Sequence, residues 1–103
     1  MKKAKIFVNG ILAGHLEEIS RRTHYRFTYL TGYVGPSVSL EMPTSTSIYD
    51  YDRFPPFFEG LLPEGLMLEG LLRQCKLDRN DLMGQLTTVG GDLVGNVTVE
   101  GIS

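Results

Sequence analysis

The chain has a single cysteine, Cys75, and no tryptophan among its 103 residues. One cysteine cannot form a disulfide within the chain, and no Cys-X-X-Cys or related spacing is present that would hold zinc. We therefore expect neither a disulfide framework nor a structural metal site. A sequence of this kind fits the reducing cytoplasm best.

Long apolar runs and an excess of basic charge are missing as well. The apolar run from Ile6 to Val8 is far shorter than the about 7–15 residues of a signal peptide's hydrophobic region. No run approaches the about 18 residues of a membrane span. The net charge is −2, so no overall basic field would hold phosphates by counterion release. Secretion, membrane insertion and direct nucleic-acid binding are therefore poor first explanations.

The composition is that of an ordinary globular domain. Hydrophobic residues make up 42% and charged residues 21%, values at which a chain folds around a core. The length suffices for one core and no more. We therefore expect one domain over residues 1–103.

Alternating residues near the start of the chain predict strands. Asn9-Gly10 separates two apolar runs within residues 3–16. This is the strongest short signal of an antiparallel hairpin, because both residues tolerate positive φ. A period of two then places Tyr25, Phe27 and Tyr29 on one face of a third strand over residues 23–30.

The chain changes character after one more set of alternating residues. Val38, Leu40 and Met42 alternate with polar residues and predict a short fourth strand that Pro43 ends. Residues 43–52, PTSTSIYDYD, have no sustained period. We expect them to form a surface crossover between the strands and a helical half.

Two helices are predicted next. Pro56 fits the first position of a short helix that Pro63 limits. A second helix is indicated by an apolar stripe that we expect to face the core. The stripe consists of Leu68, Leu71, Leu72 and Cys75.

A third helix and a last strand complete the expected fold. The helix should begin after Asp78 as its N-cap and end at Gly90-Gly91, where positive φ is easy. Its inward side chains are expected to be Leu82, Met83 and Leu86. Residues 93–99 alternate as a returning strand does. The predicted class is α+β, an antiparallel sheet of about five strands with two or three short helices.

No combination of side chains specifies an enzyme. His15 and His24 lie on predicted strands, far in sequence from Cys75. We interpret them as strand-face histidines and a buried helix cysteine, not as a catalytic pair. The acidic residues near the middle are expected to be solvated, to cap helices or to contact a partner. These acids are Asp50, Asp52, Glu59 and Glu64.

No cofactor-binding or base-binding pattern stands out either. Residues 89–96, VGGDLVGN, lack the GxGxxG order and are interpreted as a helix end followed by a bulged strand entry. The aromatic face of the third strand could stack bases, but core packing is its commoner role. Arg21, Arg22 and Arg26 supply little positive charge beside it. We therefore expect no cofactor.

Two blocks of sequence carry a family resemblance. They are YDRFPPFFEGLLPEG over residues 51–65 and LMGQLTTVGGDLVGNV over residues 82–97. At this spacing the pair resembles the N-terminal subdomain of HipA-family serine/threonine kinases, and with the opening hairpin the resemblance extends over nearly the whole chain. In those kinases the catalytic core follows this subdomain, whereas this sequence ends at Ser103. Phosphoryl transfer needs the parts of that core, so we expect the chain not to be an enzyme.

A free-standing copy of this subdomain is similar to the HipS antitoxins of tripartite HipBST toxin–antitoxin systems. The resemblance implies an inhibitor that binds a HipT-like kinase toxin, with a HipB-like DNA-binding protein joining through the complex. One departure concerns the residues after Pro-Glu-Gly. Some relatives carry a tryptophan there, whereas here Leu66 and Met67 follow Gly65. An aliphatic or methionine anchor, or another surface, must then take the place of an aromatic plug.

The candidate partner-binding residues lie in the first block and just after it. They are Phe57, Phe58, Pro63, Glu64, Gly65, Leu66 and Met67. Core packing is expected to take at least half of the set Phe57, Phe58, Leu61 and Leu62. A loop stiffened by Pro and Gly that ends in an adaptable Met loses little conformational entropy in a cleft. We expect this loop to dock near the nucleotide or substrate cleft of the kinase.

Two other functions stay open at this stage. The subdomain could complete the kinase fold as a separately encoded piece, activating or stabilising the kinase without inhibiting it. A small regulatory or nucleic-acid-binding module that uses the aromatic strand is the third possibility, and the acidic charge balance disfavours it.

Overall fold

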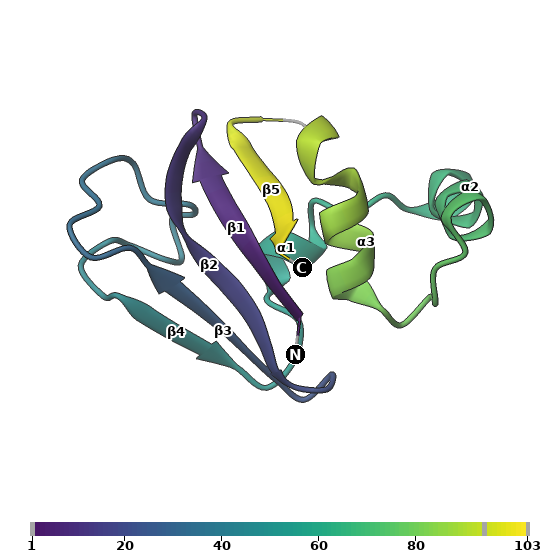
Figure 1. Ribbon diagram of the computed structural model, residues 1–103, viewed down its shortest axis with the longest axis horizontal. Coiled ribbons are helices and arrows are strands. Elements are labelled where there is room, and N and C mark those ends of the chain that lie inside the picture. The colour runs from purple at the N-terminus through teal and green to yellow at the C-terminus, as the bar shows by residue number, and fades with distance from the viewer. Residues whose placement is uncertain (1, 94, 103) are drawn as a thin grey trace.

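The described part of the chain forms five strands and three helices. The computed structural model describes residues 2–93 and 95–102. The strands are β1 (Lys2–Val8), β2 (Ile11–Ser20), β3 (His24–Tyr29), β4 (Ile48–Tyr51) and β5 (Val97–Ile102). The helices are α1 (Pro56–Glu59), α2 (Gly65–Cys75) and α3 (Leu82–Val89), followed by a 3-10 turn, η1 (Gly90–Asp92). One antiparallel sheet has the strand order β4-β3-β2-β1-β5 (Figure 1). The expected α+β class is thus confirmed.

The predicted hairpin lies near the centre of this sheet. Asn9 has a φ of 53° and Gly10 a φ of 79°, the combination that joins two strands in a tight turn with the twist of the sheet. β1 and β2 pair along their length, from Lys2 opposite Glu18 to Val8 opposite Ile11. Buried and half-buried residues alternate along β1. The described residues therefore cover one face of the hairpin more closely than the other.

The aromatic face of β3 is buried as expected. Tyr25, Phe27 and Tyr29 are between 0% and 5% exposed. The ring of Phe27 lies edge-on to that of Tyr29 with centroids 4.8 Å apart, a favourable aromatic geometry. The same face therefore provides the floor of the hydrophobic core.

The predicted fourth strand is wrong, because residues 38–42 form a loop. Val38 and Met42 are buried, but the Tyr29 hydroxyl holds them there. That oxygen accepts a hydrogen bond from the Val38 N–H at 2.9 Å and donates one to the Met42 carbonyl at 2.5 Å. Leu40, the middle residue of the predicted alternation, is 98% exposed, so the three apolar residues do not share one face as they would in a strand. The real edge strand is β4, which lies inside the segment expected to be a crossover.

The third helix begins later than predicted. Its N-cap is Asp81, whose side chain accepts a hydrogen bond from the Gly84 N–H at 3.0 Å. Asp78 instead accepts from the Asn80 N–H at 2.7 Å in the loop before the helix. This local side-chain turn competes with helix capping, and it delays the helix by three positions. Met83 and Leu86 are buried as expected, and Leu82 packs against the core.

The end of α3 lies against β5. The helix ends at Gly90 as predicted, but Gly90 has helical φ and ψ of −56° and −29° and does not use the positive φ that glycine allows. A Cβ at Gly90 would lie only 2.1 Å from the Val99 carbonyl oxygen, and glycine is needed there for close approach. The last strand begins at Val97, not at residue 93. Val94, which falls within the predicted strand and the glycine-rich segment, lies outside the described residues.

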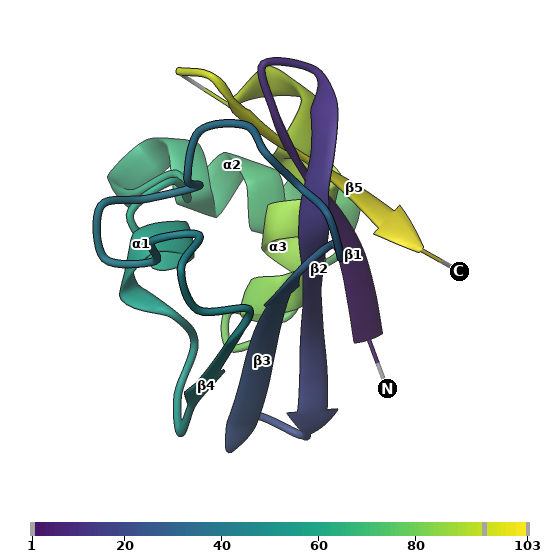
Figure 2. The same cartoon turned by 90° about the vertical axis from the view of Figure 1, so that its left-hand side faces the viewer.

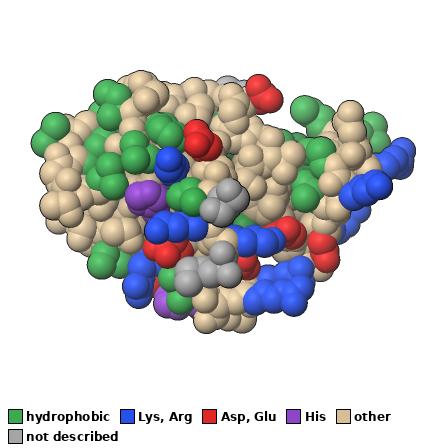
Figure 3. Space-filling view, in the orientation of Figure 1, with side chains coloured by type: hydrophobic (Ala, Val, Ile, Leu, Met, Phe, Trp, Pro, Cys, Tyr) green, Lys and Arg blue, Asp and Glu red, His purple; other side chains and the backbone are tan. Residues whose placement is uncertain are grey.

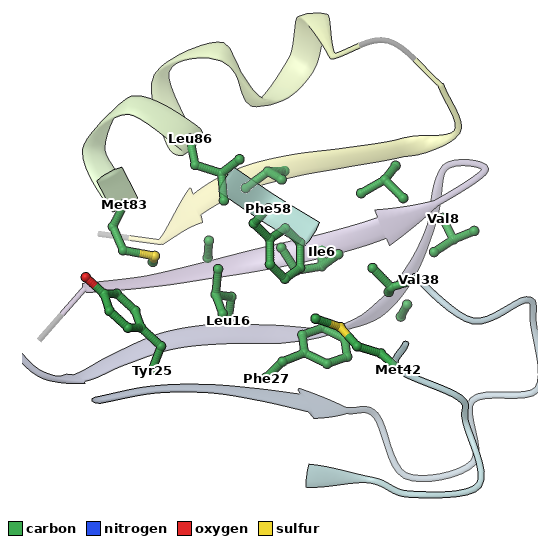
Figure 4. Close-up of a cluster of buried hydrophobic side chains, with 14 of the residues drawn as sticks. Ile6, Val8, Leu16, Tyr25, Phe27, Val38, Met42, Phe58, Met83 and Leu86 are labelled. Carbon is green, nitrogen blue, oxygen red and sulfur yellow. The ribbon is translucent and has the colours of Figure 1, made fainter. Parts of the chain in front are cut away.

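The hydrophobic core fills the space between one face of the sheet and the helices α1 and α3. Figure 4 shows side chains from α1 and α3 directed onto the sheet, and Figure 2 shows both helices on the same side of the strands. The large side chains that are at most 1% exposed include Ile6, Leu16 and Phe27 from the sheet, Phe58, Met83 and Leu86 from the helices, and Met42 from the loop before β4. Helix α2 contributes nothing to this core.

Candidate functional site

The segment Arg53–Gly65 is anchored by its first half. Phe54 and Phe58 are 4% and 0% exposed. The Phe54 ring meets that of Tyr25 edge-on at 5.3 Å, and the Phe58 ring lies 6.1 Å from that of Phe27. Pro56 occupies the first turn of α1, where its missing N–H is not needed. This half therefore fixes the position from which the second half leaves the domain.

The second half of the segment forms an exposed tip. Pro63 is half-buried, whereas Glu64 and Gly65 are exposed. Gly65 has a φ of 59°, a conformation that strains any residue with a side chain. The tip leads directly into α2, where Leu66 is 90% and Met67 76% exposed. Two large apolar side chains thus stand in solvent immediately after a rigid turn.

Helix α2 lies away from the body of the domain. It has no buried residue, and in Figure 1 it stands at the far right, beyond α3. Leu68, Leu71 and Leu72 are only half-buried. The expectation that this stripe faces the core is therefore wrong. Cys75, at the end of the same stripe, is exposed and not buried as predicted.

The ends of α2 are held by local interactions. At its C-terminus Lys76 adopts a left-handed φ of 54°, and its N–H bonds to the Leu72 carbonyl. The Leu77 N–H reaches the same carbonyl at 3.1 Å, which closes the last turn in the usual way. Glu69 forms an ion pair with Arg79 in the following loop. None of these contacts joins α2 to the sheet.

The loop between α2 and α3 is, by contrast, fastened to the domain. The side-chain amide of Gln85, which is 1% exposed, donates to the carbonyls of Asp78 and Arg79 at 3.2 and 2.9 Å. Lys2 on β1 forms an ion pair with Asp81 at the start of α3. The exposed helix is therefore presented from two fixed points, α1 before it and α3 after it.

The seven predicted partner-binding residues occupy different environments. Phe58 is fully enclosed, and Phe57 packs against the core from its edge. Leu61 and Leu62 are partly buried and pack against the same core. Core packing thus claims the phenylalanine pair and the leucines, as expected. The surface that a partner can reach consists of Pro63, Glu64, Gly65, Leu66 and Met67.

The accessible surface is wider than the sequence predicted. Leu68, Leu71 and Leu72 were assigned to the core, yet their helix has no buried side. The sequence did contain a sign of this wider surface. Leu66 and Met67 fall outside the predicted stripe, so apolar residues surround the helix and do not form one core-facing side. In Figure 3 hydrophobic side chains gather over α2 with Lys and Arg side chains beside them.

A second group of apolar side chains is exposed at the other end of the molecule. Ile11 at the hairpin tip is 64% exposed, and Val34 and Leu40 in the loop after β3 are 96% and 98% exposed. Figure 3 shows hydrophobic side chains at upper left, over the hairpin end of the sheet. Leu40 therefore offers a surface leucine that matches Leu66 in exposure but belongs to a different region.

The titratable side chains form structural contacts. Asp50 on β4 accepts hydrogen bonds from His24 Nε2 and Arg26 Nε, both at 2.8 Å. The bond from Arg26 and then that from His24 hold the pKa of Asp50 below its ordinary value. Burial, followed by the charge of Lys3, lowers the pKa of His15. Neither histidine contacts a nucleophilic side chain in the recorded hydrogen bonds of residues 2–93 and 95–102.

Within the same described ranges, no group of three or more His, Cys, Asp or Glu side chains is arranged to hold a metal ion. No helix of these residues has the length and apolar character to span a membrane.

Two of the comparisons with known proteins name the same domain. Residues 4–100 match the family described as the HipA N-terminal domain. An uncharacterised protein of Haemophilus influenzae is 29% identical over 100 residues, which are 97% of this chain and 92% of that protein. Among solved structures, one described as the N-terminal domain of HipA toxin has a TM-score of 0.77 and 26% identity. That similarity covers 100% of this chain and 94% of the solved one.

Proposed function

Because the chain belongs to the family of HipA N-terminal domains, we propose that it is an antitoxin that binds and inhibits a HipT-type serine/threonine kinase toxin. It acts by binding and not by catalysis, and the complex forms in the cytoplasm. A HipB-like DNA-binding protein joins the assembly through the kinase. The observation that carries this proposal is the apolar helix α2, which has no buried residue in its own domain.

Helix α2 needs a partner for energetic reasons. An isolated helix shorter than about 12–15 residues is marginal in water, and α2 has 11 residues, including Gly65 and Gly70. Most helices gain their stability by burying an apolar face. Full burial of Leu66 or Met67 is worth about 1.5–3 kcal/mol each. A kinase surface that covers α2 supplies what the domain itself does not.

The tip before α2 gives the contact its direction. Gly65 fixes the turn at a φ of 59°, so Leu66 and Met67 project from a short and stiff connection. Met adapts its shape to irregular pockets, and a preorganised loop loses little entropy on binding. We propose that the tip docks near the nucleotide or substrate cleft of the kinase and blocks its productive closure. Closure positions the phosphates and metal ions for transfer.

A second function is favoured by the half-buried leucines. A helix with half-buried Leu68, Leu71 and Leu72 is as suitable for completing a larger fold as for inhibiting a partner. The similar solved structure is itself a domain of HipA toxin. In that case the chain stabilises or activates the kinase without inhibiting it. The direction of the change in kinase activity separates the two functions.

The test compares two double variants in a phosphorylation assay with a purified HipT-type kinase. Leu66→Asp with Met67→Asp should weaken binding and inhibition by at least about 100-fold, or about 2.7 kcal/mol, because both side chains lose their apolar contacts. Val34→Asp with Leu40→Asp is the matched control at the other end of the domain and should inhibit normally. Circular dichroism should show that both variants are folded.

Two outcomes would contradict the proposal. Unchanged inhibition by the folded Leu66 and Met67 double variant would remove this surface from the interface. A rise in kinase activity on adding the unaltered protein would favour the completion of the kinase fold over inhibition.

A further inference from the structure

The two edges of the sheet are protected to different degrees. The backbone of β5 is closely approached by η1, since a Cβ at Gly90 would lie 2.1 Å from the Val99 carbonyl oxygen. On the opposite edge β4 pairs with β3 alone. In Figure 1 no other described part of the chain lies along the outer edge of β4. An edge strand without cover is a template for another strand.

The register determines which backbone groups of β4 are available. The Tyr29 N–H donates to the Ser47 carbonyl at 2.8 Å, so Ser47 faces β3. In an antiparallel ladder the direction alternates from residue to residue. Tyr49 and Tyr51 therefore also face β3, whereas the N–H and C=O groups of Ile48 and Asp50 point outward. These are the groups that a strand beside β4 would bond.

The charges on the open face of the sheet specify the residue opposite Asp50. One row crosses the sheet through paired positions, from Lys3 to Glu17, then to Arg26 and then to Asp50. Its charges alternate from strand to strand. The next position in the row belongs to a basic residue, because opposite charges across strands attract and like charges repel. His24 and Arg26 both donate to Asp50 Oδ1, so Oδ2 accepts neither of these two hydrogen bonds.

The other face of β4 specifies the neighbouring residues. Tyr49 and Tyr51 are half-buried and pack against the hydrophobic core. Residues on either side of the basic position would lie beside these two rings, since successive side chains of a strand point to opposite faces. Apolar side chains fit there. The edge thus matches an extended segment with an apolar-basic-apolar sequence.

We propose that β4 binds such a segment of another polypeptide as an antiparallel sixth strand. A second copy of this chain is not the occupant, because pairing β4 with itself about Asp50 places two aspartates together, and pairing about Tyr49 places Asp50 opposite Ile48, which has no basic group. The surface is separate from that proposed for the kinase, since β4 and α2 lie at opposite ends of the molecule in Figure 1. The domain can therefore contact two polypeptide segments at once.

The test adds the capped peptide Thr-Val-Lys-Val-Thr to the full chain and follows backbone amide signals by nuclear magnetic resonance. At peptide concentrations up to about 1 mM, the largest changes should occur at the amides of Ile48 and Asp50. A peptide with Glu in place of Lys should bind about fivefold more weakly. The variant Asp50→Asn should reduce that ratio to about one.

Ile48→Pro tests the backbone bonds without disturbing the sheet. The Ile48 N–H points outward, so proline removes one donor toward the peptide and none toward β3. Binding of the Lys peptide should fall by at least about fivefold, while the amides of Tyr49 and Tyr51 stay protected from exchange. Should this variant unfold β4, the Lys-to-Glu ratio in Asp50→Asn still decides the proposal.

Three results would overturn the proposal. One is the absence of changes at Ile48 and Asp50 with the Lys peptide. Another is equal binding of the Lys and Glu peptides by the unaltered chain. The third is concentration-dependent dimerisation that Ile48→Pro abolishes, since this would assign the edge to a second copy.

Discussion

The sheet and helix α2 use similar residues in opposite ways. In β3, every second side chain is aromatic and at most 5% exposed. Helix α2 has 11 residues, of which five besides Cys75 are apolar, and none of them is buried. Apolar content therefore does not distinguish the region that holds the domain together from the region that is free to bind. The difference lies in whether a facing layer exists.

The largest effect in this comparison should come from Phe58. Its side chain is 0% exposed and packs near Phe27. Phe58→Ala should lower the free energy of unfolding by about 3–5 kcal/mol, because it leaves a cavity between α1 and the sheet. Met67→Ala should change it by no more than about 0.5 kcal/mol, since that side chain is 76% exposed. Urea unfolding measures both values.

The comparison between the two regions would fail if these two variants were equally destabilised. A large loss for Met67→Ala would mean that α2 packs on the domain in solution.

Glycine-to-alanine changes sharpen the contrast, because they should act with opposite sign in the two regions. Gly90→Ala introduces a Cβ against the Val99 carbonyl and should lower the free energy of unfolding by about 1–3 kcal/mol. Gly70→Ala in α2 meets nothing within 4 Å and should raise local helix stability by up to about 1 kcal/mol. Thermal unfolding measures the first effect, and amide hydrogen exchange in α2 measures the second.

Equal tolerance of alanine at the two positions would contradict the close packing of η1 on β5. Faster exchange in α2 of Gly70→Ala would show that another contact, not helix propensity, governs that helix.

The sequence predicted those elements whose causes are local. The Asn9-Gly10 turn and the alternation in β3 each follow from a few neighbouring residues, and both were confirmed. The prediction of a strand at residues 38–42 failed, because the two buried residues there are held by the Tyr29 hydroxyl, nine and 13 positions away in sequence. No local pattern contains that contact.

The candidate site was predictable in position but not in extent. The exposed tip from Pro63 to Met67 follows from its Pro and Gly residues, which also separate it from the anchored Phe58. The stripe of α2 was misplaced, because a helical period shows that a face needs cover but not which molecule provides it. A helix that packs on its own domain would have the same sequence pattern.

The last prediction concerns how charge ties α3, but not α2, to the sheet. Burial acts to raise the pKa of Asp81, but hydrogen bonds from Lys2 and from the Gly84 N–H outweigh it and hold that pKa below its ordinary value. A carboxyl with a lowered pKa in the folded state stabilises the fold above the unfolded pKa of about 3.9. That stabilisation is lost as the pH falls through the folded pKa. The ion pair of α2, between Glu69 and Arg79, stays within the helix and its following loop.

Asp81→Asn should therefore cost about 0.5–1 kcal/mol at pH 7 and progressively less below about pH 4. Asparagine still caps the helix, so the loss reports the charge and not the cap. Urea unfolding at both pH values measures it. Lys2→Met should show the same pH dependence, because it removes the other half of the pair. A loss that stays constant from pH 7 to about pH 3 would mean that the contact between β1 and α3 does not depend on this charge, and the distinction between a fastened α3 and a free α2 would then rest on apolar packing alone.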